Sequence, residues 1–327
     1  MKYNLLITGG AGFIGSNLVG RFLDDPRIGL VRVLDDLSNG LYENIAEFEL
    51  HPKFEFIKGD ICDYETCTMA MKGIHKVTHQ AALGSVPRSI QNPMRTNEVN
   101  VGGTVNVLHA AKEAGADRVV LAFSSSTYGD SPELPKVEHR IGNPLSPYAV
   151  SKLAAEHYAQ VFCRTYGLNF VGLRYFNIFG PKQNPDNPYA AVIPLFCRAF
   201  IEGNRPLING DGTTSRDFTF VENVLHANDL ALFTEDAEAL NQVYNVACGD
   251  QVSLNEMVKM LQTISGREIE AVYGPERAGD VKHSKADISK IRTRLGYSPR
   301  VLMYEGLRQV YDWNKKMYEE KFLQVQN

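Results

Sequence analysis

The stretch that decides the fold is Leu5-Leu6-Ile7-Thr8-Gly9-Gly10-Ala11-Gly12-Phe13-Ile14-Gly15. An aliphatic run that suits a buried strand leads into a glycine-rich turn. A helical pattern follows at once, with Ile14, Leu18 and Phe22 on one face. A strand joined to a helix by such a turn is the first unit of a parallel α/β sheet.

The glycines of this stretch predict a nucleotide site. They are spaced G-x-x-G-x-x-G, at Gly9, Gly12 and Gly15. Glycine permits the tight turn and lets backbone N–H groups come close to a pyrophosphate at the N-terminus of the helix. We therefore expect these glycines, with Phe13 and Ile14 between them, to bind a dinucleotide. The alternative is a tight turn that binds no ligand.

The alternation of short strands and helices continues through the first half of the chain. Strands are expected at Asn4–Thr8, Leu30–Leu34, Phe54–Lys58, Lys76–His79, Arg118–Phe123 and Asn169–Leu173, and helices at Phe13–Asp24, Tyr64–Met71, Pro93–Ala114 and Pro147–Tyr166. This rhythm predicts βαβ units and an α/β fold with a Rossmann-type doubly wound parallel sheet.

The rhythm changes after residue 176, where loops rich in Pro, Asn and Gly interrupt shorter elements. The segments Asp217–Leu232 and Val243–Ala247 look like returns to the sheet. We therefore predict a nucleotide-binding Rossmann domain over residues 1–176, with returning segments at about 217–247. Residues 177–216 and 248–327 are expected to form a smaller C-terminal α/β substrate-binding lobe.

The composition excludes several classes of protein. The 327 residues carry 34 Lys+Arg and 38 Asp+Glu, a net charge of −4, with no basic cluster for nucleic acid or a membrane surface. No apolar run reaches the ~18–20 residues of a transmembrane helix. The five cysteines are scattered and lack metal-ligand spacing. We expect a cytoplasmic protein with no metal, no nucleic-acid partner and no membrane partner.

An acidic residue follows the second expected strand. A carboxylate at Asp35 would accept hydrogen bonds from the adenosine ribose and repel a 2′-phosphate, which favours NAD over NADP. The alternative is that Asp35 only caps the loop. Ligands of open α/β sheets bind at the carboxyl ends of the strands. Further cofactor contacts are therefore expected at Asn39, Gly40, Asp60, Ile61, Gln80, Ala81 and Ala82, and we add Asn100.

A second constellation points to catalysis. Ser146 and Pro147 predict the start of a helix that carries Tyr148 and Lys152 four residues apart on one face. The run Ser124-Ser125-Ser126-Thr127 ends the fifth expected strand, on the same sheet edge as the glycine-rich turn. The catalytic candidates are therefore Tyr148, Lys152, Ser124 and Ser125. Of these, Tyr148, Lys152 and Ser124 would also touch the cofactor. Another Tyr-x-x-x-Lys match, at Tyr311 and Lys315, has no associated serine run.

These motifs resemble the extended short-chain dehydrogenase/reductase family. Four further motifs narrow the resemblance to its nucleotide-sugar 4-epimerases: Arg174-Tyr175-Phe176-Asn177, Asn209-Gly210-Asp211-Gly212, Ser215-Arg216-Asp217-Phe218 and Arg277-Ala278-Gly279-Asp280. Enzymes that act on UDP-N-acetylhexosamines are the most similar, through Ala82-Leu83-Gly84-Ser85-Val86-Pro87-Arg88-Ser89 and Asp280-Val281-Lys282-His283-Ser284. The resemblance covers almost the full chain.

The resemblance implies reversible C4 epimerisation of UDP-GlcNAc to UDP-GalNAc through a 4-keto sugar. Tyr148 would take the proton of the sugar 4-hydroxyl while hydride passes to NAD, and Lys152 would lower the pKa of that phenol. Ser124 would hold the reacting oxygen. The spacer before Tyr128 is two residues shorter than in the UDP-galactose epimerases, so Ser125 and Ser126 stay open for this role. A homodimer through helices 93–114 and 147–166 is also implied.

The resemblance also supplies a set of substrate contacts. Arg216 and Arg277 are expected at the diphosphate and ribose, and Ala191 and Val192 at the uracil. The remaining expected substrate contacts are Ser85, Ser125, Ser126, Asn177, Asn209, Asp280 and Ser284.

Ser284 stands at the position that gates the sugar pocket in the family, and its small side chain predicts a preference for N-acetylated sugars. Arg88 and Lys282 are candidates to face a C6 carboxylate, so the plain sugar and its uronic acid both stay open.

Other activities fit the same motifs. UDP-glucose/galactose and UDP-glucuronate 4-epimerases, a net NAD-dependent nucleotide-sugar dehydrogenase and a redox-silent NAD-binding module are the alternatives. Relatives that dehydrate or decarboxylate the 4-keto sugar carry an acid in or just after the serine run, and Ser124-Ser125-Ser126-Thr127 contains none. The intact Ser124, Tyr148 and Lys152 set argues against the redox-silent module.

Overall fold

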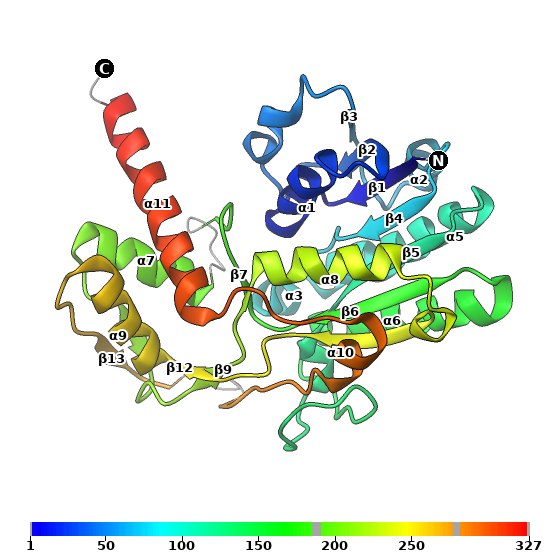
Figure 1. Cartoon of the computed structure of the whole chain (residues 1–327). Helices are drawn as coiled ribbons and strands as arrows, with labels where there is room; N and C mark the ends of the chain where they lie inside the picture. The colour runs from blue at the N-terminus through cyan, green and yellow to red at the C-terminus, as the bar shows by residue number, and fades with distance from the viewer. Residues whose placement is uncertain (1, 185–190, 277–281, 326–327) are drawn as a thin grey trace.

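A parallel sheet of seven strands forms the centre of the molecule, in the order β11-β6-β5-β4-β1-β2-β3 (Figure 1). The computed structural model describes residues 2–184, 191–276 and 282–325. The strands are β1 (Tyr3–Thr8), β2 (Ile28–Asp35), β3 (Phe54–Lys58), β4 (Lys76–His79), β5 (Arg118–Ser124), β6 (Phe170–Tyr175) and β11 (Gln242–Val246). The strand order reverses between β1 and β4, which is where open α/β sheets bind ligands.

Helices cover both faces of this sheet, as a parallel sheet requires. One face is covered by α1 (Phe13–Leu23) and α8 (Val221–Phe233), and the other by α2 (Tyr64–Met71), α5 (Thr104–Glu113) and α6 (Pro147–Tyr166). Because β6 lies between the two helix layers, all six of its residues are buried. The predicted doubly wound α/β fold is confirmed.

The helix expected at Pro93–Ala114 contains an irregular turn. It consists of α4 (Pro93–Asn97), the π-helical η3 (Glu98–Gly103) and α5. A Cβ on Gly103 would lie 2.5 Å from Ile61 Cδ1, so the helix packs closely against the loop after β3 only because this residue is glycine. The short helix α3 (Val86–Gln91) precedes it.

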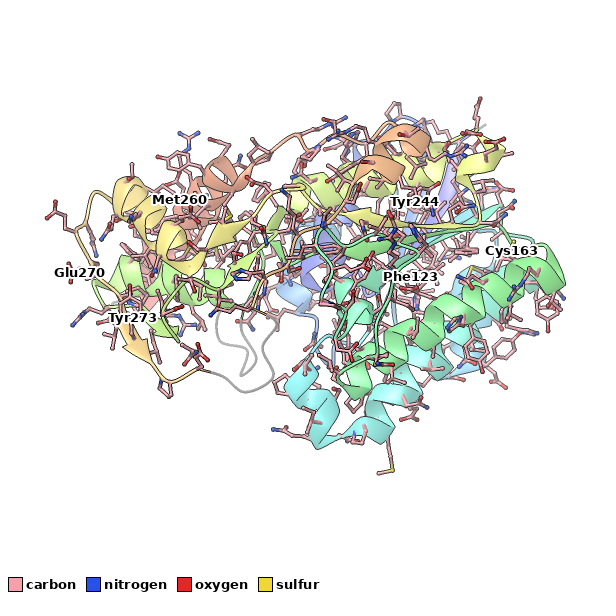
Figure 2. The ribbon with its side chains drawn as sticks, turned by 90° about the horizontal axis from the view of Figure 1, so that it is seen from below. Phe123, Cys163, Tyr244, Met260, Glu270 and Tyr273 are labelled. Carbon is pink, nitrogen blue, oxygen red and sulfur yellow. The ribbon has the colours of Figure 1, made fainter. Side chains whose placement is uncertain are left out.

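A smaller α/β region lies beside the carboxyl ends of the strands. The helices α7 (Val192–Glu202), α9 (Leu254–Ser265) and α11 (Met303–Val325) pack on one another, next to the strand pairs β8 (Leu207–Asn209) with β13 (Val272–Gly274) and β9 (Ser215–Arg216) with β12 (Val252–Ser253). Figure 2 shows Met260, Glu270 and Tyr273 of this region at the opposite end of the molecule from Cys163 on α6.

The chain crosses between the two regions more than once. β11 returns to the sheet and pairs with β6, as expected for Val243–Ala247, and α8 packs on the sheet within the other expected return. The helix α10 (Ser289–Leu295) also reaches back, since Lys290 Nζ donates to the Val243 carbonyl at 3.0 Å. The strands β7 (Ile178–Phe179) and β10 (Thr219–Phe220) form a separate pair between the regions. The predicted division into domains stays a prediction.

One buried carboxylate joins three segments at the boundary between the sheet and the smaller region. Asp217 is fully buried, and its oxygens accept hydrogen bonds from the backbone N–H groups of Cys248 (2.9 Å), Gly249 (3.0 Å) and Ala286 (3.2 Å). Burial raises the pKa of Asp217 to about 6, against the lowering effect of these three donors. The side chain therefore fixes the end of β11 and the segment after Ser284 beside Arg216.

No helix among the described residues combines the length and the apolar character that crossing a membrane would require.

Replacing Asp217 with alanine should destabilise the fold. Three N–H groups, one buried and two half-buried, would lose their acceptor, and each unsatisfied buried group costs about 1–3 kcal/mol. We expect the free energy of unfolding from urea titration to fall by about 3 kcal/mol or more. Asp250→Ala is the matched control, because Asp250 is exposed and, among the described residues, accepts a hydrogen bond from the adjacent Gln251 N–H alone. That control should change stability by no more than about 0.5 kcal/mol. Equal effects of the two substitutions would contradict the role given to Asp217.

Candidate active site

A cavity of about 1000 Å³ lies at the carboxyl ends of the strands. It runs across the switch point between β1 and β4 and continues to the smaller region. Its lining includes most of the expected site residues: Gly9, Gly12, Phe13, Ile14, Gly15, Asp35, Asn39, Gly40, Asp60, Ile61, Gln80, Ala81, Ala82, Ser85, Ser124, Ser125, Ser126, Tyr148, Lys152, Asn177, Arg216 and Ser284.

The glycine-rich turn is packed too tightly for side chains. A Cβ on Gly9, whose φ is +69°, would lie 2.6 Å from the backbone nitrogen of Ala81, and a Cβ on Gly15 would lie 2.1 Å from the Gly9 carbonyl oxygen. Gly12 is the N-cap of α1, and no side chain caps this helix. The first turn of α1 thus faces the cavity without an intramolecular anion, which fits a pyrophosphate.

Asp35 is held at the end of β2 by the same turn. One carboxylate oxygen accepts from Ala11 N–H and the other from Leu37 N–H, each at 2.9 Å. Burial raises the pKa of Asp35, and these two hydrogen bonds oppose that rise. A carboxylate oxygen can accept two hydrogen bonds, and each oxygen of Asp35 has one described donor. Each can therefore accept one more hydrogen bond from a ligand in the cavity. This acceptor set fits the two hydroxyls of an adenosine ribose.

Asp60 is already engaged by a neighbour. Its carboxylate accepts from Arg95 Nη2 at 2.9 Å and from Cys62 N–H at 2.8 Å. Burial acts to raise the pKa of Asp60, but the hydrogen bonds from Arg95 and Cys62 and the charge of Arg95 together outweigh it, and the pKa is lowered. An ionised, paired Asp60 is an acceptor that stays in place at the end of β3.

Asn100 lies behind the cavity rather than in its lining. Its side-chain oxygen accepts from Leu83 N–H at 2.8 Å, and its Nδ2 donates to the Leu83 carbonyl (3.2 Å) and to Ser151 Oγ (3.0 Å). Ser151 Oγ in turn donates to the Tyr148 carbonyl at 2.8 Å. Asn100 therefore connects the segment after β4 to the helix that carries Tyr148.

His79 extends this buried network to β1. Its Nδ1 lies 2.7 Å from Thr8 Oγ1 and its Nε2 lies 3.0 Å from Thr104 Oγ1, which donates to the Asn100 carbonyl. Burial lowers the pKa of His79 to about 3, so the ring is neutral at physiological pH. The network is uncharged and fixes β1, β4 and the α6 helix relative to one another.

Tyr148, Lys152 and Ser124 meet in the middle of the cavity. Burial raises the pKa of Tyr148, and a hydrogen bond with Ser124 opposes the rise. Lys152 Nζ donates to the Ala122 carbonyl at 2.9 Å. Burial also lowers the pKa of Lys152 to about 8, partly offset by the charge of Glu156. Below that pH the ammonium is charged, and a positive charge beside Tyr148 favours its phenolate form.

The three serines at the end of β5 and in the turn after it, Ser124, Ser125 and Ser126, all line the cavity. Ser124 Oγ accepts from Ser126 N–H at 3.1 Å, which fixes the turn after β5. Ser126 Oγ is buried and has no hydrogen-bond partner in the described part of the chain. A buried hydroxyl without a partner in the cavity lining points to a ligand group as its partner.

The smaller region contributes Arg216 and Ser284 to the opposite side. Arg216 Nη1 donates to the carbonyls of Ser215 (3.0 Å) and Lys282 (3.1 Å), and Ser284 N–H donates to the Ser215 carbonyl at 3.1 Å. Two more lining residues, Asn177 and Ser85, are held by hydrogen bonds to the backbone. Asn177, at a φ of +41°, donates to the Asp217 carbonyl, and Ser85 caps α3 by accepting from Arg88 N–H.

Some of the other expected residues are described but are not part of the cavity lining, and two are not described. Ala191, Val192 and Asn209 are described but are not part of its lining, and Arg277 and Asp280 lie outside the described residues. Arg88 lines the cavity, and its Nη2 donates to Asn39 Oδ1 at 3.0 Å. Lys282 is exposed and lies outside the lining.

Lys136 is a lining residue that the sequence did not reveal. It lies in the loop between the serine run and α6, yet it is only 5% exposed, and burial lowers its pKa. A lysine in a Pro-containing loop normally suggests a solvated side chain, and no local pattern distinguishes this one. Asp217 was likewise recognised only as part of a motif, without its anchoring role.

The charges of the cavity are separated along its length. Its carboxylates, Asp35, Asp36 and Asp60, follow β2 and β3. The opposite end, formed by Ser126, Lys136, Arg216 and Ser284 and called the lobe end below, has cations and no carboxylate among the described lining residues. No group of three or more His, Cys, Asp or Glu side chains in the described ranges is placed to hold a metal ion.

Comparison with known proteins agrees with this geometry. Residues 5–247 match the NAD dependent epimerase/dehydratase family. UDP-glucose 4-epimerase of Mycolicibacterium smegmatis is 37% identical over 310 residues, which is 94% of this chain and 97% of the relative. The UDP-N-acetylglucosamine 4-epimerase of Methanobrevibacter ruminantium, solved with UDP-N-acetylmuramic acid, is 38% identical with a TM-score of 0.91, covering 97% of this chain and 100% of that one.

A third relative was solved with its cofactor. The UDP-glucuronic acid 4-epimerase of Bacillus cereus, in complex with UDP-glucuronic acid and NAD, is 32% identical with a TM-score of 0.89 and covers 96% of this chain and 100% of its own. The glycine turn, the open N-terminus of α1 and Asp35 fit the same cofactor here. The chain belongs to the NAD dependent epimerase/dehydratase family and is an NAD-dependent nucleotide-sugar 4-epimerase.

Proposed function

We propose that this enzyme inverts C4 of UDP-N-acetylhexosamines, converting UDP-GlcNAc and UDP-GalNAc into one another. The observation that carries the proposal is the small side chain of Ser284 in the cavity lining, at the lobe end. Ser126 Oγ, buried and without a hydrogen-bond partner among the described residues, supplies a hydrogen-bonding group at the same end. A small residue beside a free hydroxyl suits a bulky polar substituent such as an acetamido group.

The relatives support a UDP-sugar and leave its substituents open. The Methanobrevibacter ruminantium and Bacillus cereus structures were solved with UDP-N-acetylmuramic acid and UDP-glucuronic acid, and the Mycolicibacterium smegmatis relative is a UDP-glucose 4-epimerase. For this chain we assign Arg216 to the diphosphate, because it is the guanidinium among the described lining residues of the lobe end and two backbone carbonyls hold it in place. A UDP-glucose or UDP-glucuronate substrate is the second candidate.

Tyr148 is the proposed acid–base group. In the first half-reaction its oxygen takes the proton of the sugar 4-hydroxyl, and Ser124 orients that hydroxyl through the hydrogen bond it shares with Tyr148. The glycine-rich turn and Asp35 would hold NAD, which would supply the acceptor and donor of the C4 hydride. After the 4-keto sugar presents its other face, Tyr148 gives the proton back to the new 4-hydroxyl. Proton and hydride are both restored, so the net change is inversion at C4.

Lys152 supports this proton transfer electrostatically. A phenol has a pKa of about 10, so a base that works near pH 7 needs about 4 kcal/mol of differential stabilisation of its phenolate. The buried Lys152 ammonium, held by the Ala122 carbonyl, lies one helical turn from Tyr148. In a buried site its charge is weakly screened, so it supplies part of that stabilisation.

The lining also favours epimerisation over elimination. Loss of water from a 4-keto sugar requires an acid or base beside a neighbouring carbon. Ser124, Ser125 and Ser126 carry hydroxyls only. The described carboxylates of the cavity lie at its other end, at Asp35, Asp36 and Asp60. The 4-keto sugar is therefore left to be reduced again.

Proton NMR of the sugar region tests the proposed activity. We expect UDP-GlcNAc to give UDP-GalNAc, recognised by the changed coupling of H4, without net formation of NADH. Tyr148→Phe should lower kcat by about 10²–10⁴-fold, because it removes the acid–base group. Tyr311→Phe is the matched control: Tyr311 also stands four residues before a lysine, but it is buried in the core formed with α11. Steady NADH formation, or full activity of Tyr148→Phe, would disprove the mechanism.

A bulky residue at position 284 should restrict the substrate range. Ser284→Tyr is expected to lower kcat/KM for UDP-GlcNAc by at least about 10-fold more than for UDP-glucose, since the ring would fill the space of the acetamido group. Separate initial-rate measurements on the two substrates check this. An equal loss on both would show that Ser284 does not select the substituent.

We also propose that the enzyme is a homodimer that pairs through α6. Val150, Tyr158 and Val161 of this helix are 55%, 41% and 42% exposed, at spacings that place them on one face. Sedimentation velocity should give about twice the 36.5 kDa of one chain. Val161→Glu should shift the species toward monomer, whereas Val272→Glu, at a similarly exposed valine of β13, should not. A monomeric wild-type protein would refute this assembly.

A further inference from the structure

Lys136 is a buried cation in the cavity lining that neither the family motifs nor the mechanism above uses. It is 5% exposed and lies at the lobe end with Ser126, Arg216 and Ser284. Lysine is almost never buried to this degree unless a partner compensates its charge. Its presence in the cavity therefore calls for a chemical reason.

The backbone of Lys136 is fixed on three sides. Its N–H donates to the Lys285 carbonyl at 2.7 Å, and its carbonyl accepts from Asp287 N–H and from Asn245 Nδ2, each at 2.9 Å. These contacts join the loop to β11 and to the segment that directly follows Ser284. The side chain is consequently anchored beside the residue proposed to select the sugar substituent.

The ammonium group has unused hydrogen-bonding capacity. Lys136 Nζ donates to the Ser131 carbonyl, while an ammonium has three donors. No carboxylate of the described residues lies within ion-pair distance of it. The acidic side chain whose charge acts on Lys136 is Glu133, and Glu133 pairs with Arg140 at 3.0 Å. A buried charge with free donors is costly, so a ligand of opposite charge would compensate it.

The other cations of the cavity are less suited to such a ligand. Arg88 donates to Asn39, next to the cofactor residues, and Lys282 is exposed outside the lining. Lys152 is engaged with the Ala122 carbonyl and serves Tyr148. Arg216 is assigned to the diphosphate. Among the described lining residues, Lys136 is thus the lobe-end cation left for the sugar ring itself.

We propose that the Lys136 ammonium binds a carboxylate carried by the hexose, and that UDP-N-acetylhexosaminuronic acids are therefore substrates. This inference rests on the proposed C4 epimerisation and adds the charge of the sugar to it. The absence of any carboxylate from the described lining at the lobe end removes the repulsion that would otherwise oppose an acidic sugar.

Paired substrates that differ only at C6 test the proposal. We would measure kcat/KM for UDP-GlcNAcA and UDP-GlcNAc with the NAD-loaded wild-type enzyme and with Lys136→Met, Lys136→Gln and Lys136→Arg. The ratio of the acidic to the neutral substrate should fall about 10- to 100-fold in the Met and Gln variants, the loss expected for one charge-assisted hydrogen bond. It should be largely kept in Lys136→Arg. Glutamine retains a donor for the Ser131 carbonyl, so its effect isolates the charge.

Lys285→Met is the matched control. Lys285 is the next lysine along the neighbouring segment and does not line the cavity, so its loss should leave the ratio unchanged. Melting temperatures separate folding from recognition: a merely structural Lys136 would lower the melting temperature of Lys136→Met without changing the ratio, and this would overturn the proposal.

The substrates also distinguish the two proposals. Wild-type turnover of UDP-GlcNAc but not UDP-GlcNAcA would refute the role of Lys136 and leave the proposed function standing. An equal loss on both substrates in Lys136→Met would assign the side chain to a group that they share and would likewise overturn the proposal. Turnover of neither substrate would overturn both.

Discussion

The close approach of two backbone segments at the switch point governs the site. Gly9 directly follows β1 with a positive φ, and its Cα lies so near the backbone of Ala81 after β4 that no Cβ fits between them. Gly15 is pressed in the same way against the Gly9 carbonyl. These contacts bring the N-terminus of α1 to the strand edge, and the cavity opens where the strand order reverses. A side chain at either glycine would move the helix away from the place where its dipole acts.

The remaining site residues depend on buried hydrogen bonds rather than on local sequence. Asn100 and His79 lie behind the cavity and connect β1, β4 and α6 through neutral groups. Asp217 performs a similar task for the smaller region, since one carboxylate holds the end of β11 and the segment after Ser284 next to Arg216. The polar side-chain atoms of each anchor have hydrogen-bond partners, and such networks specify one arrangement of their surroundings. Tyr148 and Ser284 can therefore face one cavity although they come from different regions of the chain.

The parts that the sequence predicts well are those governed by short-range chemistry. Strand and helix periodicity located all six expected strands of the sheet, and the spacing of Tyr148 and Lys152 placed them on one helical face. The glycine turn revealed the nucleotide site because its geometry demands those residues. Lys136 could not be found in this way. Its burial results from contacts with Asn245, Lys285 and Asp287, more than 100 residues away in the sequence, and a loop lysine looks the same whether or not such contacts form.

The two buried lysines of the cavity show how the fold trades stability for function. Burial lowers the pKa of both Lys152 and Lys136, which means that each charged form is less favourable here than in water. Each ammonium has a single backbone carbonyl as its described partner, from Ala122 or Ser131, and a single neutral acceptor compensates little of the lost hydration. A sequence selected only for stability would place apolar side chains at these positions. Lys152 is explained by the phenolate it favours at Tyr148. Lys136 is also buried with one described carbonyl partner, but among the described residues it has no group like Tyr148 beside it that would explain its charge. The same reasoning therefore leads to an anionic group on the substrate as the partner of Lys136.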